Sequence, residues 1–205
     1  MAPRRARKGR GKRKGGRYER SLCRRLSLWW SSMEREDLFD RSSGSGSSAT
    51  VGARRGKQMT QRAGDISANG REGASLLALF TIEAKHYNNL AVAQVVFRGT
   101  GKLVEFWKQA RQQTQPGRAP MLVACQDRQP ELLVTNTDGV DMLCRTAGKR
   151  LSVAVLPKLD AHVLLFADVL TEVDARALRS NFKQRIKQTL ASDRAHGKKR
   201  RSDHQ

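Results

Sequence analysis

The stretch Leu76-Leu-Ala-Leu-Phe-Thr-Ile-Glu-Ala-Lys85 is an apolar run that ends in a carboxylate and an amine. Its length and composition predict a β-strand from Leu76 to Lys85. A shorter strand is predicted at Gly64–Ala68, directly before the turn-forming pair Asn69-Gly70. Two strands joined by such a turn are typical of an antiparallel hairpin. The sequence therefore predicts a hairpin at the centre of the fold.

Charged residues end the longer predicted strand. Because side chains alternate between the two faces of a strand, Glu83 and Lys85 are expected to share a face. Burying these charges is costly unless something compensates them, and a metal ion would do so. Asp65 in the shorter strand offers a second carboxylate, and Mg²⁺ (or Mn²⁺) suits a site with two carboxylates and several waters. Lys85 would then orient the attacking water or offset developing negative charge.

A helix is predicted before this hairpin, from Arg17 to Trp30, because apolar residues recur there every three or four positions. Glu19 lies near the apolar side of this helix and would complete the acidic cluster as a third metal ligand. Trp29 and Trp30 are candidates for stacking on unpaired bases, although aromatic residues at helical spacing more often belong to the core.

The remaining pattern predicts an α/β fold with a central mixed sheet flanked by helices. A helix over Lys102–Gln113, ended by Pro116-Gly117, separates the central strand from an apolar strand at Pro120–Cys125, which implies a crossover connection. Further elements are expected towards the C-terminus: strands at Leu132–Thr135, Leu151–Leu156 and His162–Leu170, and a helix at Val173–Leu190.

Positive charge dominates the composition. The chain has 205 residues with 40 Lys plus Arg against 19 Asp plus Glu, a formal net charge of +21, which predicts a polyanionic partner such as nucleic acid. A Gly- and Ser-rich loop from residue 41 carries Arg54, Arg55 and Lys57, which are placed to contact a phosphate backbone. The basic face of the last helix is equally consistent with phosphate binding and with solubility; its residues are Arg176, Arg179, Lys183, Arg185 and Lys187.

The charge distribution also predicts the domain organisation. The two ends are strongly basic and poor in apolar residues, so they gain little from folding. The expected divisions are a basic disordered arm at 1–15, one globular domain at 16–170, a basic helix at 171–192 and a basic disordered tail at 193–205.

Several classes of protein are excluded by the sequence. The longest apolar stretches, 75–84 and 161–170, are about half of the roughly 20 residues that span a bilayer. The basic N-terminal run has no apolar segment behind it, so no secretory signal is expected and an intracellular location is predicted. Cys23, Cys125 and Cys144 are odd in number and widely spaced, which excludes a disulfide scaffold and a zinc finger.

Each candidate residue also has a simpler interpretation. Glu83 and Lys85 would form an ion pair on a solvated face, and Asp65 would cap a turn. Glu19 would pair with a neighbouring arginine on the helix surface. His86, next to Lys85, would be an exposed polar residue rather than a contact to phosphate.

Taken in chain order, four motifs resemble the PD-(D/E)XK nuclease superfamily, and most closely the archaeal and phage-type Holliday junction resolvases. They are Gly16-Arg-Tyr-Glu19-Arg-Ser-Leu22, Arg41-Ser-Ser-Gly-Ser-Gly46, Gly64-Asp65-Ile66 and Thr81-Ile82-Glu83-Ala84-Lys85. The resemblance extends from Lys14 to Cys125, and includes the helix with Gln109. It implies a restriction-endonuclease-like core, Asp65 and Glu83 as metal ligands, Lys85 as the catalytic lysine and Glu19 as the helix carboxylate. Ser43 or Ser45 would correspond to the serine of a mobile loop that contacts DNA.

The resemblance implies a Mg²⁺-dependent DNA endonuclease that acts on branched DNA, as a homodimer, in the cytoplasm of a bacterium or a phage-infected host. Two alternatives remain open at this point. One is a non-catalytic nucleic-acid-binding protein whose acidic residues are structural. The other is the same chemistry in a packaging, repair or restriction role.

Overall fold

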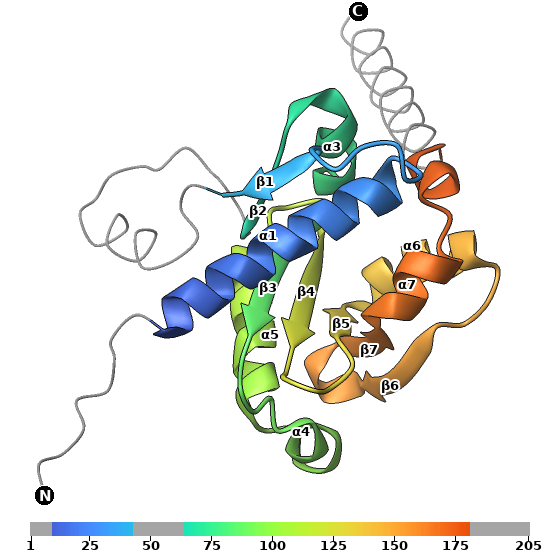
Figure 1. The fold of residues 1–205 in the computed structure, drawn as a ribbon. Helices are drawn as coiled ribbons and strands as arrows, with labels where there is room; N and C mark the ends of the chain where they lie inside the picture. Colours follow the sequence, from blue (N-terminus) through green and yellow to red (C-terminus); the bar gives the residue numbers. More distant parts are fainter. Residues whose placement is uncertain (1–9, 43–63, 181–205) are drawn as a thin grey trace, which may run out of the picture.

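A five-stranded mixed sheet forms the centre of the computed structural model, which describes residues 10–42 and 64–180 (Figure 1). The strands lie in the order β3-β4-β5-β7-β6. Only β3 and β4 are parallel, and the other neighbours are antiparallel. Their bounds are β3 Phe80–His86, β4 Ala119–Cys125, β5 Leu132–Thr135, β6 Ser152–Leu156 and β7 Ala161–Leu165. The predicted α/β class with a mixed sheet is therefore confirmed.

Helices cover both faces of the sheet. Because side chains alternate along β4, Met121 and Val123 enter one apolar cluster while Leu122 and Ala124 enter another. Residues of α1, α3, α6 and α7 build the first cluster, and residues of α4 and α5 build the second. Their bounds are α1 Arg10–Trp30, α3 Gly70–Leu77, α4 Val92–Arg98, α5 Lys102–Gln113, α6 Thr137–Ala147 and α7 Phe166–Glu172. A short 3₁₀ turn, η1 (Pro157–Leu159), joins β6 to β7.

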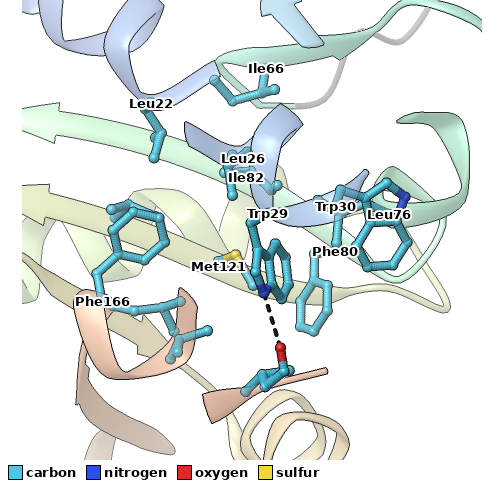
Figure 2. Packing of buried hydrophobic residues seen from close by; sticks show 14 of the residues in the cluster. Leu22, Leu26, Trp29, Trp30, Ile66, Leu76, Phe80, Ile82, Met121 and Phe166 are labelled. Carbon is cyan, nitrogen blue, oxygen red and sulfur yellow. Dashed lines mark hydrogen bonds between the residues drawn. The ribbon is translucent and has the colours of Figure 1, made fainter. Parts of the chain in front are cut away.

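The helix α1 crosses the sheet and supplies much of the first cluster (Figures 1 and 2). Trp29 and Trp30 are buried, and their indole Nε1 atoms donate hydrogen bonds to the carbonyls of Val173 and Glu72, each at 3.0 Å. They are core residues, so neither is available to stack on bases. The helix begins at Arg10, seven residues earlier than predicted.

The predicted hairpin is wrong. Residues 70–77 form the helix α3, and β3 starts only at Phe80. The short strand β2 (Ile66–Ala68) pairs instead with β1 (Phe39–Arg41), which was not predicted. Gly73 explains the packing of α3, because a Cβ there would lie 2.4 Å from the carbonyl oxygen of Leu38. Leu76 is therefore buried as part of a helix that approaches the β1 region closely.

Elsewhere the predictions agree in part with the structure. The crossover from β3 through α5 to β4 and the strand β5 are confirmed. The predicted strand His162–Leu170 is wrong in its second half, because β7 ends at Leu165 and Phe166 starts α7. The helices α4 and α6 were not predicted.

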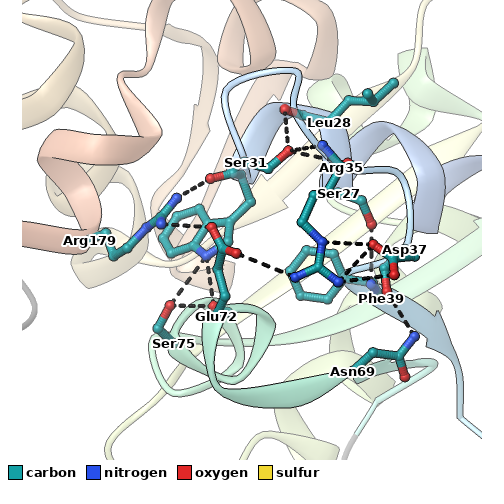
Figure 3. A network of polar contacts seen from close by, with 11 residues as sticks. Ser27, Leu28, Ser31, Arg35, Asp37, Phe39, Asn69, Glu72, Ser75 and Arg179 are labelled. Atoms are coloured by element: carbon teal, nitrogen blue, oxygen red, sulfur yellow. Dashed lines mark hydrogen bonds and ion pairs between the residues drawn. The ribbon is translucent and has the colours of Figure 1, made fainter.

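The segment after α7 is joined to the body of the protein by polar contacts (Figure 3). Residues 175–180 are helical. Arg179 donates to a carboxylate oxygen of Glu72 at 2.8 Å, and its guanidinium lies 5.0 Å from the ring centroid of Trp30. Arg179 is therefore a structural residue. The other basic candidates of this helix, Lys183, Arg185 and Lys187, lie outside the described residues, as do Ser43, Ser45, Arg54, Arg55 and Lys57.

The structure also bears on membrane-spanning helices and on disulfide bonds. None of the helices in the described ranges is long and apolar enough to cross a membrane. The three cysteines are free thiols.

Candidate active site

The open edge of β3 holds the first candidate residue. Because β3 is an end strand, β4 occupies only one of its sides. On the other side, the Asp65 amide donates to the carbonyl of Ile82 at 2.9 Å, and Asp65 Oδ2 accepts from the amide of Ala84 at 3.0 Å. Gly64 permits this approach, because its φ is +84° and a Cβ there would lie 2.5 Å from the Ile82 oxygen. Asp65 is thus fixed to β3 without a hairpin.

The structure brings Asp65, Glu83 and Lys85 together. Lys85 Nζ donates to Glu83 Oε2 at 2.8 Å and to Asp65 Oδ2 at 3.2 Å. The side chains of Lys85, Asp65 and Glu83 are 19%, 12% and 2% exposed, so water screens these contacts weakly. This is not the solvated surface ion pair that was the simpler interpretation of Glu83 and Lys85.

The charges of this cluster do not balance. Burial and the neighbouring carboxylate of Asp65 raise the pKa of Glu83 to about 7, although Lys85 acts in the opposite direction. Burial alone would lower the pKa of Lys85, but the two carboxylates outweigh it and the pKa is raised. One ammonium therefore faces two carboxyl groups, and Glu83 is only partly ionised near pH 7. The all-oxygen donor set fits a hard divalent cation held by Asp65 and Glu83, and such a cation would favour the ionised form of Glu83.

Glu19 is held away from this pair. It forms an ion pair with Arg41 of β1, the strand packed beside α1. Across the described part of the chain, no group of three or more His, Cys, Asp or Glu residues is arranged to hold a metal ion. The structure thus brings together two of the three predicted metal ligands, and Arg41 supplies the charge that neutralises Glu19.

A basic groove of about 800 Å³ lies at the carboxyl end of β3 and was not predicted. It is lined by Arg13, Lys14, Arg17, Tyr18, Ser21, His86 and Asn88. His86 is not the exposed polar residue expected: its side chain is 15% exposed, and its Nε2 lies 2.8 Å from Asp127 Oδ1. The site was not predicted because residues 1–15, which include Arg13 and Lys14, were assigned to a disordered arm. The spacing of Arg13, Arg17 and Ser21, each four residues apart, is the helical signal that would have revealed it.

Comparison with known proteins identifies one family. A family model described as phage putative PDDEXK endonuclease matches residues 10–159, which run from the start of α1 to the end of η1. The match includes Asp65, Glu83, Lys85 and the whole basic groove. It confirms the resemblance to the PD-(D/E)XK superfamily. No curated protein and no solved structure gave a significant match.

Proposed function

Because this chain belongs to the phage putative PDDEXK endonuclease family, we propose that it hydrolyses phosphodiester bonds of DNA at the open edge of β3. The observation that carries this proposal is the contact of one partly buried lysine with two buried carboxylates. A solely structural cluster would be more stable with charges that balance, since an excess buried charge is costly. The raised pKa of Glu83 indicates that its ionised form lacks a balancing charge, which a bound cation would supply.

Asp65 and Glu83 would hold the cation, and we propose Mg²⁺ because two carboxylates leave most of its coordination to water. When bound, such a metal offers Lewis-acid polarisation of a phosphoryl oxygen and a lowered pKa for water. Lys85 remains an ammonium, so it can stabilise negative charge that develops on the phosphate. The hydrogen bonds from Ala84 and to Ile82 fix Asp65, so little reorganisation is needed.

The test is cleavage of labelled DNA by the full chain, with Mg²⁺ or with a chelator. Asp65→Asn, Glu83→Gln and Lys85→Met keep side-chain size and are each expected to lower the cleavage rate at least about 100-fold. Asp141→Asn and Lys108→Met are matched controls, because both residues are exposed and lie on α6 and α5. The controls should cut like the parent. Binding measured in chelator should be retained by all five variants.

Cleavage by Asp65→Asn and Lys85→Met at the parental rate would refute the active site. Retained binding without any metal-dependent cleavage by the parent would favour the non-catalytic nucleic-acid-binding protein.

The finer assignments rest on the resemblance to Holliday junction resolvases. We propose branched DNA as the substrate and a homodimer as the active form. A four-way junction should be cut at least 10-fold faster than linear duplex of the same sequence, and sedimentation should give twice the chain mass. Equal rates on both substrates would instead favour a packaging, repair or restriction role.

A further inference from the structure

We propose that the basic groove binds the sugar-phosphate backbone of DNA beside the cleaved bond, and that Asp127 stands in for a phosphate there while DNA is absent. The groove means the site lined by Arg13, Lys14, Arg17, Tyr18, Ser21, His86 and Asn88. This inference rests on the proposed function, because it takes DNA as the substrate.

The side chains that line the groove are mainly cationic or polar, which favours binding of an anion. Arg13 and Lys14 lie one turn before Arg17 on α1, and His86 and Asn88 come from the end of β3 and the loop after it. Arg13 and Arg17 are exposed, so their guanidinium groups are open to a ligand. Guanidinium and ammonium groups are the usual donors to phosphate oxygens. A volume of about 800 Å³ is large for a single small anion and suits a length of backbone.

An acidic residue already occupies the position between two of these donors. The two carboxylate oxygens of Asp127 take one partner each: Lys14 Nζ at 2.5 Å and His86 Nε2 at 2.8 Å. Lys14 Nζ also donates to Asn88 Oδ1 at 3.1 Å. Two anionic oxygens between two nitrogen donors reproduce the pattern a phosphate would make. The Asp127 side chain is 56% exposed, so a phosphate can displace it into solvent.

The groove and the proposed active site lie on opposite faces of β3 near its carboxyl end. Lys85 and His86 are consecutive in β3, so their side chains point to opposite faces of the strand. The metal-binding pair lies along the open edge of this strand, and the groove lies at its carboxyl end on the side of α1. A DNA backbone that passes the end of β3 would contact both. The groove would thus place the strand, and the cluster at the edge would cleave it.

Binding of fluorescent duplex DNA to the full chain tests the groove, in chelator so that nothing is cut. The double variant Arg13→Ala/Arg17→Ala should bind at least 10-fold more weakly at 0.15 M salt. The slope of log affinity against log salt should fall by about 1.8, since each lost phosphate contact contributes roughly 0.9. Arg145→Ala/Arg150→Ala removes the same charge from exposed positions outside the groove and should change affinity less than threefold. Equal losses of DNA affinity in both double variants would overturn the proposal that the groove binds DNA.

A double-mutant cycle tests the role of Asp127. Asp127→Asn should bind DNA three- to tenfold more tightly, because Lys14 and His86 no longer have a competing anion. Asp141→Asn, an exposed acid on α6, controls for the loss of one negative charge and should change affinity less than twofold. In a Lys14→Ala background the gain from Asp127→Asn should shrink at least by half. An undiminished gain would show that Asp127 acts only through long-range charge.

These outcomes separate the groove from the active site. If Asp65→Asn and Lys85→Met cut normally while the Arg13/Arg17 variant loses binding, the catalytic assignment fails and the groove stands. If the Arg13/Arg17 variant binds DNA like the parent while Lys85→Met cannot cut, the groove is not a DNA-binding site and the catalytic assignment stands.

Discussion

Two carboxylates and one ammonium meet at the open edge of β3, and this ratio is the main chemical fact at the scale of single residues. The type and spacing of Glu83 and Lys85 were enough to predict a shared face, because alternation along a strand is a rigid rule. The contact with Asp65 was also predicted, but for the wrong reason. The contact depends on Gly64 and on two hydrogen bonds to β3. The local sequence pattern does not predict these interactions. The pairing of Glu19 with Arg41 was unpredictable because β1 has only three residues.

The raised pKa of Glu83 predicts how stability depends on pH. Its ordinary value is 4.5 and its value in the folded protein is about 7, so the folded state holds a proton that the unfolded state has lost between these values. Without metal, the free energy of unfolding should therefore fall as pH rises from about 4.5 to 7, by up to about 3 kcal/mol. Glu83→Gln should remove this fall. Thermal unfolding in chelator between pH 5 and 8.5 measures it.

Saturating Mg²⁺ should abolish this fall, because Glu83 is then ionised in both the folded and the unfolded state. The metal needs the ionised carboxylate, so its stabilising effect should grow with pH up to about 7 and then level off. Asp141→Asn provides the control and should follow the parent. A pH profile for Glu83→Gln that matches the parent would contradict this assignment.

At the scale of elements, the two long helices α1 and α5 were predicted, whereas the shorter helices α3, α4, α6 and α7 were not. A period of three to four over many residues identified α1 and α5, and length gave the signal its strength. The leucines at 76 and 77 were assigned to a strand because a short apolar run fits either element. The structure resolves this ambiguity through tertiary contact: Gly73 lets α3 approach Leu38, and Trp30 donates to the carbonyl of Glu72. Such contacts lie far apart in sequence and cannot be derived from local periodicity.

Two glycines provide a prediction at this scale. Gly64→Ala forces a side chain into a backbone with φ +84° and against the Ile82 oxygen, so Asp65 should be displaced from β3. Gly73→Ala meets the Leu38 oxygen instead, away from the cluster. Each should cost at least about 2 kcal/mol of stability. Rates should be measured well below the unfolding temperatures of both variants. Under that condition, only Gly64→Ala should have a lower cleavage rate per folded molecule than the parent. Parental cleavage by folded Gly64→Ala would show that the position of Asp65 is unimportant.

At the scale of the whole molecule, positive charge is concentrated at the two ends of the chain. Residues 1–20 carry ten Lys or Arg and one acid, and residues 194–205 carry five and one. The structure divides the first group in two. Arg13, Lys14 and Arg17 belong to α1 and line the groove, whereas Arg4, Arg5, Arg7 and Lys8 precede the helix. A deletion of residues 1–15 would remove Arg13 and Lys14 together with the four residues before the helix, so it cannot separate a tail effect from a groove effect.

Replacing only Arg4, Arg5, Arg7 and Lys8 by Gln makes that separation, because α1 begins at Arg10. If these four residues bind phosphates, the slope of log affinity against log salt should fall by up to roughly 3.6. The cleavage rate at saturating DNA should stay unchanged, because counterion release adds affinity without touching the cluster at β3. The Arg13/Arg17 variant provides the comparison: the two slope changes should add when the variants are combined, since separate contacts contribute independently. An unchanged slope in the Gln variant would assign these four residues to targeting rather than to DNA.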